Sequence, residues 1–180
     1  AMFLWFIGGS FVGVWTVLQD PAVDYRLVML GAVLPDLVDA PWGGARLGHT
    51  LAASVIVLFG VMVATRGRRL RRRLLAIPIG MLVHLVLDGM WTDARVFWWP
   101  LQGWHLAGAG GLPSLAHPVI VSVAEEVAGA AALVWCWFRF ELGEPGRRAR
   151  FLHTGRLARD TGPRGGTAGF PSPRPRRPDR

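Results

Sequence analysis

Long apolar stretches, separated by short polar connections, dominate the chain up to residue 140. Four of them have the length that a helix rising about 1.5 Å per residue needs to cross a hydrocarbon core of about 30 Å. These stretches are residues 1–18, 47–65, 74–92 and 119–140. A fifth apolar stretch, residues 25–34, is limited by Asp24, Arg26 and Pro35, so it predicts a short interfacial or half-helix. The pattern predicts an all-α fold, a polytopic membrane helical bundle of about four transmembrane helices plus this short helix.

The composition supports a membrane protein. Hydrophobic residues make up 52% and charged residues only 18% of the 180 positions, whereas soluble domains carry about 25% charged residues. This composition argues against an ordinary soluble enzyme. The 20 basic residues are all arginine and outnumber 12 acidic residues, which gives a net charge of +8. High hydropathy together with a positive charge is typical of membrane proteins with basic cytoplasmic loops.

The arginines are concentrated in two places. Six lie in residues 66–73 and eleven lie from Arg139 onward. Because positive residues favour the cytoplasmic side, we expect this basic turn and the tail to be cytoplasmic. With four spans the N-terminus is then cytoplasmic as well, in a multi-pass protein of the inner or plasma membrane. The loops around residues 20–47 and 93–118 are expected to face outward.

Two regions follow from this pattern: a transmembrane helical domain at residues 1–140 and a basic cytoplasmic tail at residues 141–180. The tail is rich in Arg, Pro and Gly, and we expect disorder toward its end. Binding of lipid headgroups explains its arginines, so membrane lipids are the expected partner and nucleic acid is disfavoured. The single cysteine, Cys136, excludes an internal disulfide framework and a cysteine-based zinc site.

Two ionisable residues interrupt the third apolar stretch. His84 and Asp88 are four residues apart, so both project from one face of a helix, about 6 Å apart along its axis. An aspartate inside a span costs roughly 2.5–3.5 kcal/mol and must be compensated. A bound metal ion and a His–Asp hydrogen bond to a neighbouring helix both fit this pair.

The expected topology brings further metal-ligand types to the same side. Asp36 and Asp39 lie in the outer loop, and His49 lies at the outer end of the second span. Five candidate metal ligands therefore converge: Asp36, Asp39, His49, His84 and Asp88. This convergence favours the metal site over the hydrogen bond. Oxygen and imidazole ligands without thiolate suit zinc, manganese or iron, and zinc is the first choice for a hydrolytic site.

Other polar residues border this predicted site. Glu125 and Glu126 lie on the fourth span, and Glu125 is preferred because it shares a helix face with Gly129 and Ala132. It fits a general base, a ligand, a partner of a ligating histidine or a protonated structural residue. The residues expected to contact an anionic substrate are Arg46, Arg95 and Asp93.

Four short motifs resemble the bacterial membrane-bound metal-dependent hydrolases, the inner-membrane hydrolases also called LexA-binding. They are Leu-Pro-Asp-Leu-Val-Asp at 34–39, Gly-His-Thr at 48–50, Gly-Met-Leu-Val-His-Leu-Val-Leu-Asp at 80–88 and Trp-Pro at 99–100. The resemblance implies a small helical membrane protein whose metal ligands are the same five residues. One departure is that the family's His-Arg-Gly before its Thr-His-Ser is replaced here by Ala45-Arg46-Leu47-Gly48-His49-Thr50, which removes one histidine.

The resulting hypothesis is a metal-dependent hydrolase acting near the outer leaflet on an ester or phosphoester, with a lipid-linked or small-molecule substrate. A metal-bound water near neutral pKa would attack, and Asp39 or Glu125 would accept its proton. Two alternatives remain open: a small transporter or channel with Asp88 and Glu125 as relays, and a non-enzymatic scaffold whose arginine tail recruits a partner.

Overall fold

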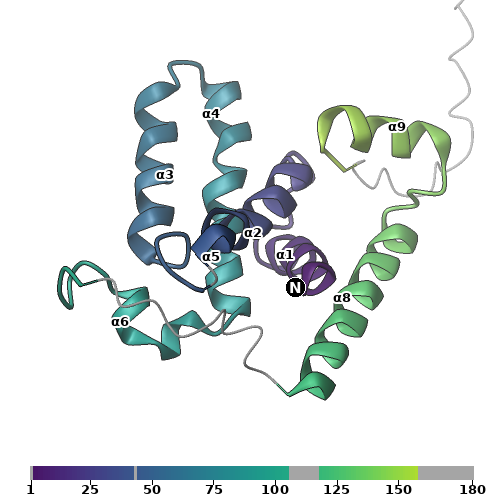
Figure 1. The fold of residues 1–180 in the computed structure, drawn as a ribbon. Helices are drawn as coiled ribbons and strands as arrows, with labels where there is room; N and C mark the ends of the chain where they lie inside the picture. The colour runs from purple at the N-terminus through teal and green to yellow at the C-terminus, as the bar shows by residue number, and fades with distance from the viewer. Residues whose placement is uncertain (1, 43, 106–117, 158–180) are drawn as a thin grey trace, which may run out of the picture.

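The computed structural model describes residues 2–42, 44–105 and 118–157, and within these ranges it is helical with no strand. The predicted all-α class is therefore confirmed (Figure 1). The α-helices are α1 (Phe3–Leu18), α2 (Tyr25–Asp39), α3 (Leu51–Ala64), α4 (Arg68–Leu74), α5 (Ala76–Leu87), α6 (Ala94–Phe97), α8 (Val119–Arg139) and α9 (Pro145–Thr154). Two 3₁₀ turns, η1 (Ala40–Trp42) and η2 (Met90–Thr92), follow α2 and α5.

Glycines bring the backbones of neighbouring helices into contact. A Cβ atom at Gly31 of α2 would lie 2.1 Å from the Ile77 carbonyl oxygen, and one at Gly80 of α5 would lie 2.2 Å from that of Val28. At the other interface, a Cβ at Gly8 of α1 would lie 2.3 Å from the carbonyl oxygen of Gly129 in α8. Only glycine permits these approaches, so α2 packs closely on α5 and α1 on α8.

The four helices that correspond to the predicted spans, α1, α3, α5 and α8, are each shorter than the span that was predicted. Among the described residues α8, with 21 residues, is long and apolar enough to cross a membrane, while α1 and α3 are apolar but shorter. The third predicted span is cut short at Leu87, because Asp88 follows and Gly89 adopts a left-handed backbone with φ of +66°. The four-span arrangement thus stays a prediction.

The antiparallel pair formed by α3 and α4–α5 defines two ends of the bundle (Figure 1). The connection carrying Arg66 and α4 forms one end, here called the arginine end. His49 precedes α3 and His84 and Asp88 end α5, so these residues form the opposite end, here called the histidine end. The expected basic turn is itself helical from Arg68, and α4 continues into α5 through Leu75, whose backbone is right-handed helical.

Side-chain contacts establish the direction of α1. The Trp5 indole donates to the Leu87 carbonyl (3.4 Å) and the Phe6 ring lies 4.1 Å from that of His84, so α1 begins at the histidine end. Trp15, near its other end, packs against Phe140 at the end of α8, with ring centroids 4.8 Å apart. Both α1 and α8 therefore run from the histidine end to the arginine end.

The short helix predicted at residues 25–34 extends through Pro35 to Asp39 and traverses the bundle. It begins beside Arg73 of α4, which pairs with Asp24 at 2.9 Å, and it ends beside His49. Because α2 makes this additional traverse, the two termini of the described chain lie at opposite ends of the bundle. The structure therefore does not support the prediction that both are cytoplasmic.

The folded unit continues beyond the predicted boundary at residue 140. Leu142 and Leu157 are buried in one core cluster with Phe11 and Tyr25. The Tyr25 amide donates to the Gly155 carbonyl (2.9 Å), and the Leu157 amide donates to that of Pro21 (3.0 Å). The part of the predicted tail after Leu157 lies outside the described residues.

The buried carboxylate of Asp24 supports this junction. Arg26 donates to it from the same chain segment and Arg73 donates to it from α4. Burial alone would raise the pKa of Asp24, but these two guanidinium groups lower it below its ordinary value. The ion pairs thus tie the start of α2 to α4 at the arginine end.

The glycine contacts lead to a matched stability test. We expect Gly129→Ala to destabilise the protein by about 1–3 kcal/mol, because the new Cβ would lie 2.2 Å from backbone atoms of Leu4. Gly60→Ala in α3 is the control, since its Cβ would meet nothing within 4 Å. Thermal unfolding in detergent measures both variants, and equal melting temperatures for the two would contradict the packing described.

Candidate metal centre

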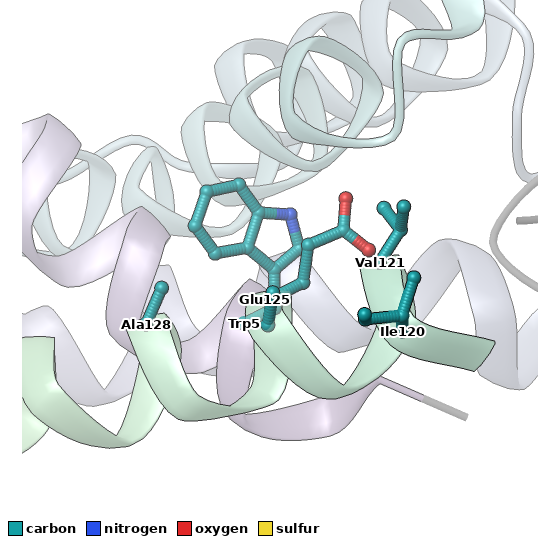
Figure 2. Close-up of a pocket in the computed structure, with 6 residues that line it drawn as sticks. Trp5, Ile120, Val121, Glu125 and Ala128 are labelled. Atoms are coloured by element: carbon teal, nitrogen blue, oxygen red, sulfur yellow. The ribbon is translucent and has the colours of Figure 1, made fainter. Parts of the chain in front are cut away.

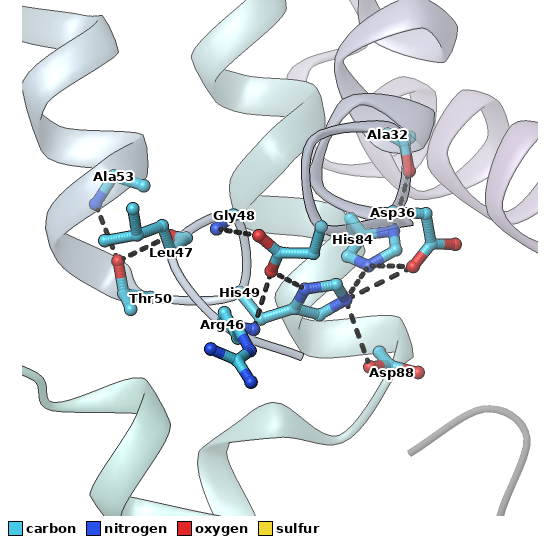
Figure 3. Close-up of polar contacts among 11 residues, drawn as sticks. Ala32, Asp36, Arg46, Leu47, Gly48, His49, Thr50, Ala53, His84 and Asp88 are labelled. Carbon is cyan, nitrogen blue, oxygen red and sulfur yellow. Dashed lines mark hydrogen bonds and ion pairs between the residues drawn. The ribbon is translucent and has the colours of Figure 1, made fainter. Parts of the chain in front are cut away.

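Three chain segments bring one acidic and two imidazole side chains together at the histidine end. Asp36 lies in the last turns of α2, His49 in the turn before α3 and His84 in the last turn of α5 (Figure 3). Each offers one ligand atom, and these atoms all lie within 4.8 Å of one another. Both histidines are fully buried. Three of the five predicted ligands therefore form a group that could hold a metal ion.

Local structure holds the His49 turn against α2. The Thr50 hydroxyl accepts a hydrogen bond from the Ala53 amide (3.0 Å) and caps the start of α3. A Cβ atom at Gly48 would lie 2.6 Å from the Pro35 carbonyl oxygen, so only glycine permits this close approach. The turn is thereby fixed beside the residues that precede Asp36.

Hydrogen bonds fix the tautomer of each imidazole. Nδ1 of His49 lies 2.8 Å from Oδ2 of Asp39, and Nδ1 of His84 lies 2.6 Å from the Ala32 carbonyl oxygen. A carbonyl oxygen and an ionised carboxylate only accept hydrogen bonds, so in both rings Nδ1 carries the hydrogen. Nε2 of each neutral ring therefore presents a lone pair.

These two lone pairs face one another. The Nε2 atoms of His49 and His84 are 3.3 Å apart, and Oδ1 of Asp36 lies 3.2 Å and 3.8 Å from them, respectively. Oδ1 of Asp36 is buried without a hydrogen-bond partner. Buried acceptors grouped in this way repel one another unless a proton or a cation lies between them. The donor set of two imidazoles and a carboxylate fits a divalent transition metal.

Negative charge surrounds the ring of His49. Carboxylate oxygens of Asp36, Asp39 and Asp88 lie 3.2 Å, 2.8 Å and 3.8 Å from its ring nitrogens. In the metal-free protein a proton on Nε2 can thus occupy the position between the acceptors. Metal binding would displace that proton.

Asp39 contacts the Nδ1 side of His49, so it lies behind the ring rather than beside the lone pairs on Nε2. Its Oδ2 also accepts from the Arg46 amide (2.7 Å), and its Oδ1 accepts from the Gly48 amide (3.0 Å). A carboxylate that fixes the far nitrogen of a histidine is the usual support of a metal-binding imidazole. This geometry favours an orienting role for Asp39 over the predicted ligand and base roles.

Asp88 lies at the edge of the group. Its Oδ2 is 3.8 Å from Nε2 of His49, and its side chain is buried. The predicted spacing from His84 is confirmed as one helical turn, since the Asp88 amide donates to the His84 carbonyl (2.8 Å). At 3.8 Å the carboxylate is close enough to interact with a group bound between the histidines.

Glu125 occupies a different position. It lines a wide-open surface cavity of about 430 Å³ on α8 beside Trp5 of α1, together with Ile120 (Figure 2). Its neighbour Glu126 accepts a hydrogen bond from the Leu4 amide at the start of α1 (3.1 Å). The close packing predicted for the Gly129 face of this helix is confirmed, whereas Glu125 is not one of the three grouped ligands.

The predicted substrate-binding residues are spread around this end. The Asp93 side chain accepts from the Arg95 amide (3.2 Å) and caps α6, while the Arg95 side chain is exposed. Arg46 is half-buried and contributes its backbone amide to Asp39. Their role in binding substrate stays a prediction.

Two contributors were not predicted from the sequence. The Ala32 carbonyl orients His84, and Phe6 covers the face of the same ring. Ala32 lies one helical turn before Asp36 on the same face of α2, and this spacing could have indicated that it lies beside the site. No sequence signal distinguishes Phe6 from the other aromatic residues of its helix.

No protein-family model, characterised protein or solved structure matches this chain. The resemblance to membrane-bound hydrolases therefore stays a prediction, and the function has to be argued from the geometry above.

Proposed function

We propose that this chain is an integral membrane metal-dependent hydrolase with its centre at the histidine end. The observation that carries the proposal is the pair of buried Nε2 atoms, 3.3 Å apart and both held as acceptors. His49, His84 and Asp36 would hold the metal, and zinc is the first choice because three protein ligands leave a position open for water.

The exposed surface supports the membrane placement. On α3 the outer side chains Ile56 and Phe59 are 66% and 68% exposed, and the outer face of α8 is also apolar. Apolar surface of this extent is rare on soluble monomers and fits contact with lipid. With the arginine end cytoplasmic, the metal centre would lie toward the outer leaflet and the start of α1 on the outer side.

Each residue of the centre has a distinct part in the proposed hydrolysis. The bound metal would supply an acidified water and polarise the bond to be cleaved. Asp39 holds His49 in its ligating tautomer, and Ala32 does the same for His84. Phe6 excludes bulk water from the ring of His84. Asp88 would take the proton that the attacking water gives up and return it to the leaving oxygen, because its carboxylate borders the ligand atoms.

The cavity between α1 and α8 fits the apolar part of a lipid-linked ester or phosphoester. Its lining is apolar apart from Glu125, and its volume of about 430 Å³ is within the usual range of ligand sites. Trp5 forms one wall, and its indole donates to Leu87, the residue before Asp88. A chain held in this cavity would thus place its polar group near the metal centre.

Metal content is the first test. The wild-type protein, purified in detergent and exposed to zinc, should retain stoichiometric metal, while His84→Ala and the conservative Asp36→Asn should lose most of it. His105→Ala is the matched control, because His105 is exposed. Equal metal in the wild type and both site variants would refute the proposal. It would leave the two alternatives, the transporter and the scaffold, which stay predictions.

The role of Asp39 predicts a smaller effect. Asn has the same shape as Asp, but its NH₂ group is a donor. In Asp39→Asn this group would face another donor, either a backbone N–H of the turn or the N–H at Nδ1 of His49. We expect zinc affinity to fall by about 10–100-fold, as for other residues that orient a ligand. Competition with a chromophoric chelator measures this affinity. Complete loss of zinc from a folded Asp39→Asn protein would indicate instead that Asp39 is a ligand.

Filling the α1–α8 cavity should impair the use of long apolar substrates. With phosphatidylglycerols of increasing chain length, which contain ester and phosphoester bonds, Ala128→Trp is expected to lower kcat/KM for dioctanoyl but not for dibutyroyl lipid. Ala131→Trp is the control, because Ala131 is also exposed on the same helix but does not line the cavity. Equal loss at both chain lengths would argue against this cavity as the binding site for the chain.

A further inference from the structure

A second cavity lies at the arginine end of the bundle, away from the metal centre. It has a volume of about 240 Å³, is partly open to the surface and is lined by side chains of α1, α2, α8 and α9. Phe11, Cys136, Trp137 and Phe151 are among the apolar residues that line it. Arg148 contributes the one charged side chain of the lining.

Several contacts hold α9 against the bundle and so fix one side of this cavity. The guanidinium of Arg26 donates to the carbonyl of Leu152, in α9, and the Tyr25 amide donates to that of Gly155. Gly155 has a left-handed backbone, and a Cβ there would collide with Asp24. Buried core residues on both sides of α9, Leu142 and Leu157, hold the helix from its two ends.

Arg148 lines the cavity and is also exposed at the surface of α9. Among the described residues no acidic side chain pairs with it, whereas the neighbouring Arg147 pairs with Glu141 at 3.0 Å. A guanidinium beside an apolar cavity is suited to a phosphate, which it can bind through two hydrogen bonds. The cavity and its arginine thus complement a molecule with one apolar chain and one anionic group.

We propose that this cavity binds an anionic phospholipid, with part of one acyl chain between α8 and α9 and the phosphate on Arg148. The inference relies on the proposed membrane placement but not on the metal chemistry. Its volume is below the range of about 300–1,000 Å³ for whole small-molecule sites, which suits part of a chain. Trp137 joins the cavity to the exposed apolar face of α8, where Phe138 is 74% exposed.

The surrounding charge favours an anionic lipid over a neutral one. Arg148 and Arg150 lie on α9 with no acidic side chain paired to either among the described residues, whereas Arg147 pairs with Glu141 and Arg73 of α4 pairs with Asp24. Basic amphipathic helices bind at the level of anionic headgroups, which are enriched on the cytoplasmic side of membranes. The placement of the arginine end in the cytoplasmic leaflet agrees with this occupant.

The test uses the full-length protein, stripped of lipid in detergent, and measures its melting temperature with added dioleoyl phosphatidylglycerol or dioleoyl phosphatidylcholine. We expect phosphatidylglycerol in large excess to raise the wild-type value by about 5 °C more than phosphatidylcholine. Arg148→Gln should abolish this difference. Arg150→Gln is the matched control and should retain it, because Arg150 lies on the same helix but does not line the cavity.

Further variants and added ligands test which molecule the cavity binds. Leu133→Trp, which fills the cavity, should remove the effect while leaving the zinc content unchanged. An equal shift from phosphatidylcholine, from oleate or from inorganic phosphate would overturn the proposal, as would full retention of the shift in Arg148→Gln. Resistance to carbonate extraction from membranes, measured in parallel, tests the membrane placement separately, and zinc content tests the hydrolase centre separately.

Discussion

Two buried imidazoles that present lone pairs to each other impose the main constraint on this molecule. Nε2 of His49 and Nε2 of His84 are 3.3 Å apart, and a buried oxygen of Asp36 lies beside both. Such a group of acceptors is stable only around a positive charge. The surrounding contacts maintain it, because Asp39 and the Ala32 carbonyl bind the hydrogens on Nδ1 and so prevent either ring from turning over.

The geometry of this group depends on close helix packing directly beside the site. His84 reaches the Ala32 carbonyl because α2 and α5 are in backbone contact at Gly31 and Gly80. Larger residues at these positions would separate the helices and lengthen the hydrogen bond that fixes the ring. The glycines of the bundle therefore act on the chemistry of the centre as well as on stability. This coupling explains how a small bundle can hold a precise donor set.

Much of the site could be predicted from the sequence, because helical spacing and the direction of the predicted spans were sufficient to bring His49 to His84 and Asp88. The function of Asp39 could not be predicted, since its partners include backbone amides of a turn whose shape the sequence does not reveal. The direction of α1 was also missed. Its assignment depended on whether residues 25–34 traverse the bundle, and hydropathy gave no indication that α2 continues through Pro35 to Asp39. Burial of Val28, Ala32 and Pro35 against neighbouring helices stabilises that continuation despite the proline.

The central claim is that the two facing imidazoles bind one metal ion. X-ray absorption spectroscopy at the zinc edge of the loaded protein tests it most directly, because imidazole, oxygen and sulfur ligands give different scattering. The account predicts two imidazole nitrogens at about 2.0–2.1 Å, with oxygen ligands completing the sphere and no sulfur. A spectrum with oxygen ligands alone, without the multiple scattering of imidazole, would contradict it.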